Sequence, residues 1–320
     1  MRRYSSPEGF STLTLKLTSN GSHSVFTVFV PNGENMDGAT ESNIDAAAAD
    51  LAYFKSNGIQ GMYPVMYYTH NLHFLAVARS MGGRFADAIK AAQQLVVFLA
   101  PYIKQVATAP DLVPMLDYFS PTPALILVRF HRWGDVLKLP EPDRGLPTAN
   151  ALWHFARGSA FAGTGKLSEA EAELRSLAAT EKVIPGDVLY GLNSSQSILK
   201  VAENLLAARV SITKGNKKMA VESLRAAVDA ENALNYDEPP GWYMPVRESL
   251  GGGLMLSGDY SEAEKVFRSD LEKHPRNGRS LFGLAASLRA QGKQTAAEFV
   301  QNEFDIAWKR ADISLRVQDF

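Results

Sequence analysis

Apolar residues recur at helical spacing along most of the chain. Phe267 and Leu271 follow Ala263 at i+4 and i+8, as they would on the buried stripe of an amphipathic helix. A second stripe of leucines with the same period lies between Pro275 and Gly292. Because proline and glycine mark the ends of helices, this pattern predicts two successive helices with a short connection.

One short phrase recurs in this helical background. It consists of a glycine, an apolar or aromatic residue two positions later, and an alanine three positions beyond that. The clearest copies are residues 83–88, 165–170 and 258–263, and weaker copies are 215–220 and 292–297. Residues 131–136 form a degenerate copy, in which His131 replaces the glycine, and residues 34–39 are a further candidate. An internal repeat of this kind predicts an array of similar helical units.

The last residue of each copy serves as an anchor for the register. The anchors are Ala39, Ala88, Val136, Ala170, Ala220, Ala263 and Ala297, at intervals of 49, 48, 34, 50, 43 and 34 residues. A small residue lies twelve positions before each of the last six: Ala76, Ala124, Gly158, Ala208, Gly251 and Ala285. Small residues at matching places let two helices approach closely, and the glycine between them suits the left-handed end of the first helix. We therefore predict that each anchor is buried within a helix pair.

These features resemble a known repeat. The residues that carry the resemblance are Leu250, Gly251, Gly258, Tyr260, Ala263, Phe267 and Pro275. Together with the 34-residue interval they resemble the tetratricopeptide repeat (TPR), and the resemblance covers about residues 36–320. It implies an all-α protein: an α-solenoid of about six antiparallel helix pairs. The strings at 63–74 and 235–243 resemble a family of longer, largely uncharacterised bacterial TPR proteins, which implies further repeats upstream.

The first 35 residues break the helical pattern. Residues 12–18 and 25–30 alternate like strands on either side of Asn20 and Gly21, which is a hairpin signal. We predict an irregular or strand-like segment at 1–35 and a solenoid at 36–320. Because a helix is expected where the strands lie, this segment is either a local cap or the start of a truncated or mis-started family member. We favour the second interpretation, and we predict that residues 1–30 pack poorly on the rest.

Composition and charge narrow the class of partner. The formal net charge is −1, so the basic footprint of a nucleic-acid-binding protein is missing. The chain contains no cysteine, which excludes disulfides, thiolate metal sites and cysteine nucleophiles. We find no apolar run of about 18 residues and no signal peptide. We expect a protein or peptide partner, no membrane span and a cytoplasmic location, or an exported one if a signal peptide was lost with a truncated start.

The resemblance also implies which residues face the groove of the solenoid. On a helix expected to start near Thr69 it assigns His70 and His73 to the groove, and Tyr67, just before that helix, is a further candidate. On the first helices of the last two pairs it assigns Glu248, Met255, Arg279, Phe282 and Arg289. The stiff connector at 235–242 adds Tyr236, Asp237, Glu238 and Trp242 as loop candidates. Histidine and aromatic residues at one end and arginine at the other favour an extended peptide with an acidic end.

We predict a non-catalytic TPR-type scaffold that binds a peptide or protein segment in its concave groove and needs no cofactor. No nucleophile elbow, zinc-protease motif or supported carboxylate pair is present. The alternative is an enzyme, or a metal- or small-molecule-binding protein, with its site near His70, His73 and the 235–242 loop. Histidines one turn apart can hold a metal, although packing of His73 beneath aromatic residues explains the pair without one.

Overall fold

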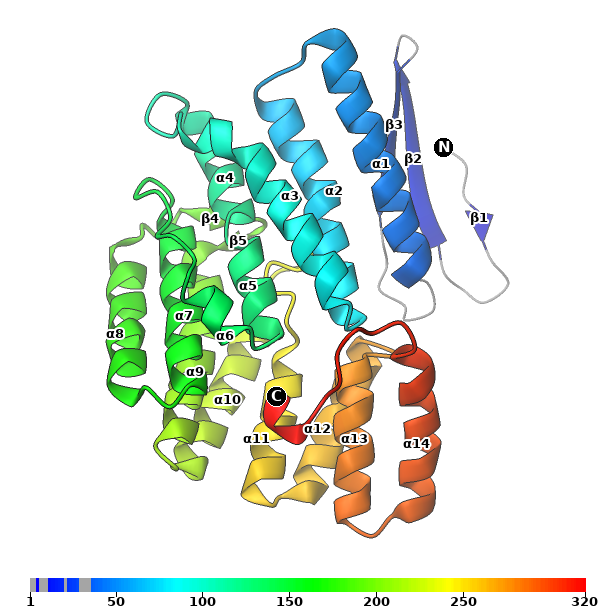
Figure 1. The fold of residues 1–320 in the computed structure, drawn as a ribbon, viewed down its shortest axis with the longest axis vertical. Coiled ribbons are helices and arrows are strands. Elements are labelled where there is room, and N and C mark those ends of the chain that lie inside the picture. The colour runs from blue at the N-terminus through cyan, green and yellow to red at the C-terminus, as the bar shows by residue number, and fades with distance from the viewer. Residues whose placement is uncertain (1–3, 6–10, 20–21, 29–35) are drawn as a thin grey trace.

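The computed structural model describes residues 4–5, 11–19, 22–28 and 36–320, and it describes the side chains of residues 40 and 43–320. Helices dominate these residues (Figure 1). The long helices are α1 (Met36–Asn57), α2 (Met62–Met81), α3 (Phe85–Ile103), α7 (Pro147–Gly163), α8 (Leu167–Val183), α9 (Ser195–Thr213), α10 (Lys217–Asn232), α11 (Val246–Ser257), α12 (Tyr260–Lys273), α13 (Gly278–Ala290) and α14 (Gln294–Ala307). Shorter helical segments are η1 (Pro110–Leu112), α4 (Val113–Phe119), α5 (Thr122–Arg129), α6 (Trp133–Val136) and η2 (Val317–Asp319). The predicted all-α class is confirmed for this part of the chain.

The N-terminal strands pair as the alternating pattern predicts. β2 (Ser11–Ser19) and β3 (Ser22–Val28) are antiparallel, and β1 (Tyr4–Ser5) pairs with the start of β2. Asn20 and Gly21, where the turn was predicted, lie outside the described residues. β3 runs beside α1 (Figure 1). The domain boundary at residue 35 and the poor packing of residues 1–30 stay predictions.

The helices pack mainly on their neighbours along the chain. Consecutive helices associate closely: α1 with α2, α2 with α3, α7 with α8, α9 with α10, α11 with α12, and α13 with α14. Successive pairs are joined in the same way, because α10 also packs on α11 and α12 on α13. The array therefore consists of consecutive antiparallel helix pairs (Figure 1).

The register predicted from the small residues is confirmed. The six anchors with described side chains are each at most 1% exposed: Ala88, Val136, Ala170, Ala220, Ala263 and Ala297. Their six partners twelve positions earlier are buried as well. The side chain of Ala39 lies outside the described ones. Gly251 shows why a small residue is needed, since a Cβ there would collide with the ring of Phe267.

The turn within each pair uses a left-handed residue. The glycines that open the clear and weak copies of the phrase have φ between +72° and +83°: Gly83, Gly165, Gly215, Gly258 and Gly292. In the degenerate copy His131 adopts the same conformation, with φ +52°. A residue with a Cβ rarely adopts this conformation, so the turn holds His131 in an unusual position. The surroundings of His131 are therefore a candidate for a functional site.

One predicted helix start is wrong. The helix expected to begin near Thr69 begins at Met62, so His70 and His73 lie well inside α2. Pro64 lies in the first turn of α2, where backbone N–H groups have no intrahelical acceptor. The lack of an N–H on proline therefore costs the helix no hydrogen bond there. The aromatic string therefore extends the helix by about two turns instead of leading into it.

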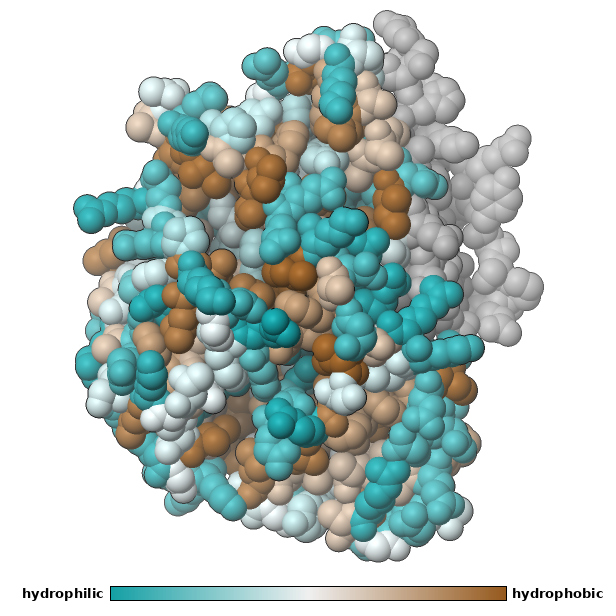
Figure 2. Space-filling view, viewed as in Figure 1, coloured by the Kyte–Doolittle hydropathy of each residue, from teal (hydrophilic) through white to brown (hydrophobic). Residues whose placement is uncertain are grey.

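Polar and charged residues cover much of the face in Figure 2, and apolar residues are scattered among them. Several large apolar side chains are exposed, including Val97, Val183 and Phe299 at about 70–80%. Among the described residues, no helix is long and apolar enough to cross a membrane.

Candidate functional site

The segment that follows α14 runs back across the helix array (Figure 1). The ring of Trp308 lies against Gly83 and Gly278, where a Cβ would collide with it. The carboxylate of Asp312 then accepts hydrogen bonds from the first backbone N–H groups of α3, at 2.7 and 2.8 Å. These contacts join the last helix pair to the turn between α2 and α3.

The same segment ends against α11 and α13. The ring of Phe320 stacks on that of Phe282, with centroids 6.1 Å apart, and lies 5.5 Å from the ring of Phe267. Gly252 leaves the space for this contact, since a Cβ on Gly252 would collide with Phe320. Arg279 lies over the Phe320 ring and donates a hydrogen bond to the backbone carbonyl of Asp319. A short peptide segment therefore covers part of the face that sequence reasoning assigned to the groove.

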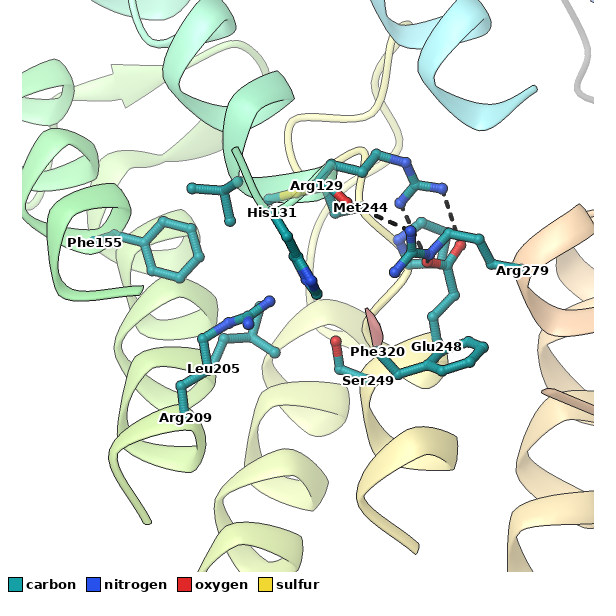
Figure 3. Close-up of a pocket in the computed structure, with 12 residues that line it drawn as sticks. Arg129, His131, Phe155, Leu205, Arg209, Met244, Glu248, Ser249, Arg279 and Phe320 are labelled. Carbon is teal, nitrogen blue, oxygen red and sulfur yellow. Dashed lines mark hydrogen bonds and ion pairs between the residues drawn. The ribbon is translucent and has the colours of Figure 1, made fainter. Parts of the chain in front are cut away.

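A buried ion network lies beside this contact (Figure 3). Arg129 of α5 donates through Nη1 and Nη2 to the two carboxylate oxygens of Glu248, at 3.2 and 3.1 Å. The Nε atom of Arg279 lies 3.0 Å from Glu248 Oε2, and Asn277 donates to Oε1 at 2.8 Å. The network therefore connects α5, α11 and α13 through one carboxylate. Burial lowers the pKa of Arg279 to about 10, which still leaves the guanidinium charged at neutral pH.

A small pocket opens next to the network (Figure 3). Arg129, Glu248, Arg279 and Phe320 line one side of the pocket, and Phe155 and Leu205 line the other. Such a combination of an apolar wall with charged groups is typical of sites for small polar ligands.

His131 and Arg209 complete this pocket. The His131 ring stacks on Trp133 at 4.6 Å, and its Nδ1 lies 3.8 Å from Asp319 Oδ1. Burial lowers the pKa of His131 to about 4, and the charges of Arg209 and Arg279 add to this effect. The ring is therefore neutral at pH 7. Arg209 extends from α9, and its guanidinium lies 5.5 Å from the Trp133 ring.

The structure brings together only part of the predicted groove set. Glu248, Arg279 and Phe282 meet around the segment at 317–320. Met255 is partly buried near the end of α11. Arg289 is exposed and donates to Gln301 of α14 at 2.6 Å, so its guanidinium is engaged on the last helix pair.

The remaining groove candidates belong to α2. His73 is 3% exposed, and the edges of Tyr118, Phe119 and Tyr243 surround it at centroid distances of 5.4–5.6 Å. Burial lowers the pKa of His73 to about 3, and its Nδ1 has no hydrogen-bond partner.

The other two α2 candidates are less buried than His73. His70 is partly buried beside Phe74, and its pKa is lowered by burial. Tyr67 packs on Tyr63 at 4.5 Å. Both therefore belong to the aromatic packing of α2.

The 235–242 loop packs against the same aromatic cluster. Tyr118 donates a hydrogen bond to the carbonyl of Pro239 at 3.3 Å. Asp237 accepts from the N–H of Leu192 at 2.8 Å, while Tyr236 is 69% exposed and bonds Glu238. The loop is therefore tied to both α4 and the β4–β5 connection, where β4 is Leu189–Tyr190 and β5 is Asn193–Ser194.

Trp242, at the end of this loop, is buried against Phe155 with ring centroids 5.5 Å apart. Within the described residues, no group of three or more His, Cys, Asp or Glu side chains could hold a metal ion.

Four residues of this site were not predicted from the sequence: Arg129, Arg209, His131 and Phe320. Only His131 carried a signal, because it stands where the repeat has a glycine. The chain matches no protein-family model and no curated protein sequence. Its function must therefore be argued from the geometry of these groups.

Proposed function

We propose that this chain is a TPR-type α-solenoid without catalytic activity that binds a peptide or protein segment on the inner face of α11 and α13. The consecutive helix pairs and the buried small residue in each pair support the TPR-type architecture. A solenoid of this kind offers an extended surface formed by successive first helices.

One observation carries the proposal: residues 317–320 already lie as a peptide on that face. Phe320 packs on Phe282, and the backbone carbonyl of Asp319 accepts a hydrogen bond from Arg279. An aromatic side chain against an apolar surface and a backbone hydrogen bond are the contacts that an incoming peptide would make. The segment then acts as an internal competitor for the partner.

The test uses a chain shortened by residues 314–320 and a fluorescent peptide with the sequence of residues 311–320. This deletion keeps Asp312 and its contact with α3. The peptide should bind the shortened chain, and its affinity for the full chain should be lower by about tenfold or more, because the attached segment is present at high effective concentration. Circular dichroism confirms that the shortened chain keeps its helices.

A matched pair of variants locates the binding face. In the shortened chain, Phe282→Ala should weaken peptide binding, whereas Phe299→Ala should not, because Phe299 is 69% exposed on α14. If the peptide binds neither chain, or if Phe282→Ala and Phe299→Ala affect it equally, the proposed face is wrong.

A further inference from the structure

The pocket beside the ion network holds more guanidinium groups than carboxylates. Arg129, Arg209 and Arg279 all line it, and Glu248 is the carboxylate among its lining residues. Arg129 and Arg279 both pair with Glu248. Among the described residues, no carboxylate lies within ion-pair distance of Arg209. Three guanidinium groups against one carboxylate side chain leave an excess of positive charge, and Arg209 is the guanidinium that has no ion-pair partner among the described residues.

Asp319 does not neutralise this charge. Its carboxylate bonds Arg316 at 2.8 Å and faces His131, and no contact joins it to Arg209. The charge of Arg209 is also unfavourable where it lies, since burial and the nearby Arg279 lower the pKa of Arg209 to about 10. Arg209 is partly buried, and a guanidinium that is partly withdrawn from water without a counter-ion costs the folded protein free energy, which its contact with the Trp133 ring offsets only in part. A bound anion would remove this cost.

The remaining polar groups of the pocket suit an oxygen-rich anion. Figure 3 shows Ser249 of α11 and Arg209 of α9 directed toward the same space, next to the ring of His131. The hydroxyl of Ser249 and the guanidinium of Arg209 are hydrogen-bond donors. Phe155 and Leu205 form an apolar wall, which strengthens electrostatic attraction by excluding water.

We infer that this pocket binds a phosphate group, with Arg209 as the cation that pairs with it and Ser249 as a hydrogen-bond donor. Donors that come from two separate helices, α9 and α11, can contact different oxygens of a tetrahedral oxyanion. The planar, two-pronged contact preferred by a carboxylate is already made by Glu248 with Arg129. The inference does not depend on peptide binding at α11 and α13.

The experiment measures binding of inorganic phosphate to the full chain by calorimetry and by the shift in melting temperature, at constant ionic strength. Arg209→Gln should weaken phosphate binding by about tenfold or more, because it removes a hydrogen bond between charged groups. The matched control is Arg225→Gln, whose side chain is 50% exposed and pairs with Glu262. The control should bind phosphate as the unmodified chain does.

A second readout separates binding from a structural role. Without phosphate, Arg209→Gln should melt close to the unmodified chain, since the variant removes an unpaired charge but also the contact of the guanidinium with the Trp133 ring. Titration with glycerol phosphate distinguishes a site for the free ion from a site for a phosphate monoester, according to which of the two binds more tightly. The inference is overturned if neither binds the unmodified chain at millimolar concentration, if Arg209→Gln binds phosphate equally well, or if phosphate raises the melting temperature of both proteins equally.

Discussion

Arg129 and Glu248 form a two-pronged ion pair across 119 residues of sequence, with both partners at most 5% exposed. The pair joins the short helix α5 to α11, and Arg279 extends it to α13. Elements from the middle and the end of the chain are thereby held together around one carboxylate. Glu248 also lines the pocket, as do Arg129 and Arg279. The buried ion pairs that hold the helices together are therefore also part of the candidate site.

We predict that Glu248→Gln destabilises the protein by about 3–5 kcal/mol, because it leaves Arg129 and Arg279 buried without a carboxylate. The change keeps the shape of the side chain, so loss of packing contributes little. The free energy of unfolding, measured by urea titration, tests this. The control is Glu222→Gln, because the Glu222 side chain is 54% exposed and its ion pair with Lys218 is long, at 4.0 Å. A similar loss in both variants would contradict the role of the network.

The second prediction concerns the repeat register. Ala263 is fully buried between α12 and its neighbours, so Ala263→Leu should overpack this contact and cost about 1–3 kcal/mol. Ala290→Leu is the control, because Ala290 is exposed at the end of α13 and has room for the larger side chain. The melting temperatures of Ala263→Leu and Ala290→Leu test this prediction. An unchanged melting temperature in Ala263→Leu would count against the packing of this pair.

The third prediction concerns the contact between Gly252 and Phe320. Gly252→Ala should push Phe320 away from α11, since the added Cβ would overlap it. Residues 309–320 should then be cleaved faster in limited proteolysis followed by mass spectrometry. Gly134→Ala serves as the control, because nothing lies within 4 Å of the Cβ that it adds. Equal cleavage rates in the two variants would mean that Gly252 does not hold the segment in place.

Sequence periodicity was sufficient for the helix pairs because their contacts are local. Ala263 and Gly251 are twelve residues apart, and the small size that each needs is visible in the repeat itself. Such local contacts occur in every unit, so one clear copy indicates how to interpret the degraded ones. The start of α2 was missed because residues 62–68 follow no repeat consensus and Pro64 resembles a helix boundary.

The candidate site could not be found in the same way. Arg129, Arg209 and Phe320 come from unrelated parts of the chain: from α5, from α9 and from the segment after α14, which folds back over the array. No periodic pattern records such a contact. The predicted Glu248 and Arg279 were placed on a groove surface, but they pair with each other and lie buried beside Arg129, which the repeat pattern did not single out.

The last prediction concerns acid sensitivity and His73. The folded protein keeps this buried ring neutral down to a pKa of about 3, whereas an exposed histidine in the unfolded chain takes up a proton near pH 6.5. As pH falls below about 6.5, the unfolded state therefore binds one more proton than the folded state at this residue, and stability decreases. His73→Phe removes the titrating group and the unpaired Nδ1 but retains a ring against Tyr118, Phe119 and Tyr243.

Between pH 6.5 and 4, the free energy of unfolding of the unmodified chain should decrease more steeply than that of His73→Phe, by up to about 1.4 kcal/mol per pH unit. Urea titrations at each pH measure both slopes. His70 and His131 also have lowered pKa values, and they are present in both proteins, so the difference between the slopes isolates His73. Above pH 7 the difference in stability between the two proteins should stay constant, because His73 is neutral in both states. Parallel curves across the acid range would show that His73 is accessible to protons in the folded protein, as a ligand-binding histidine in an open groove would be.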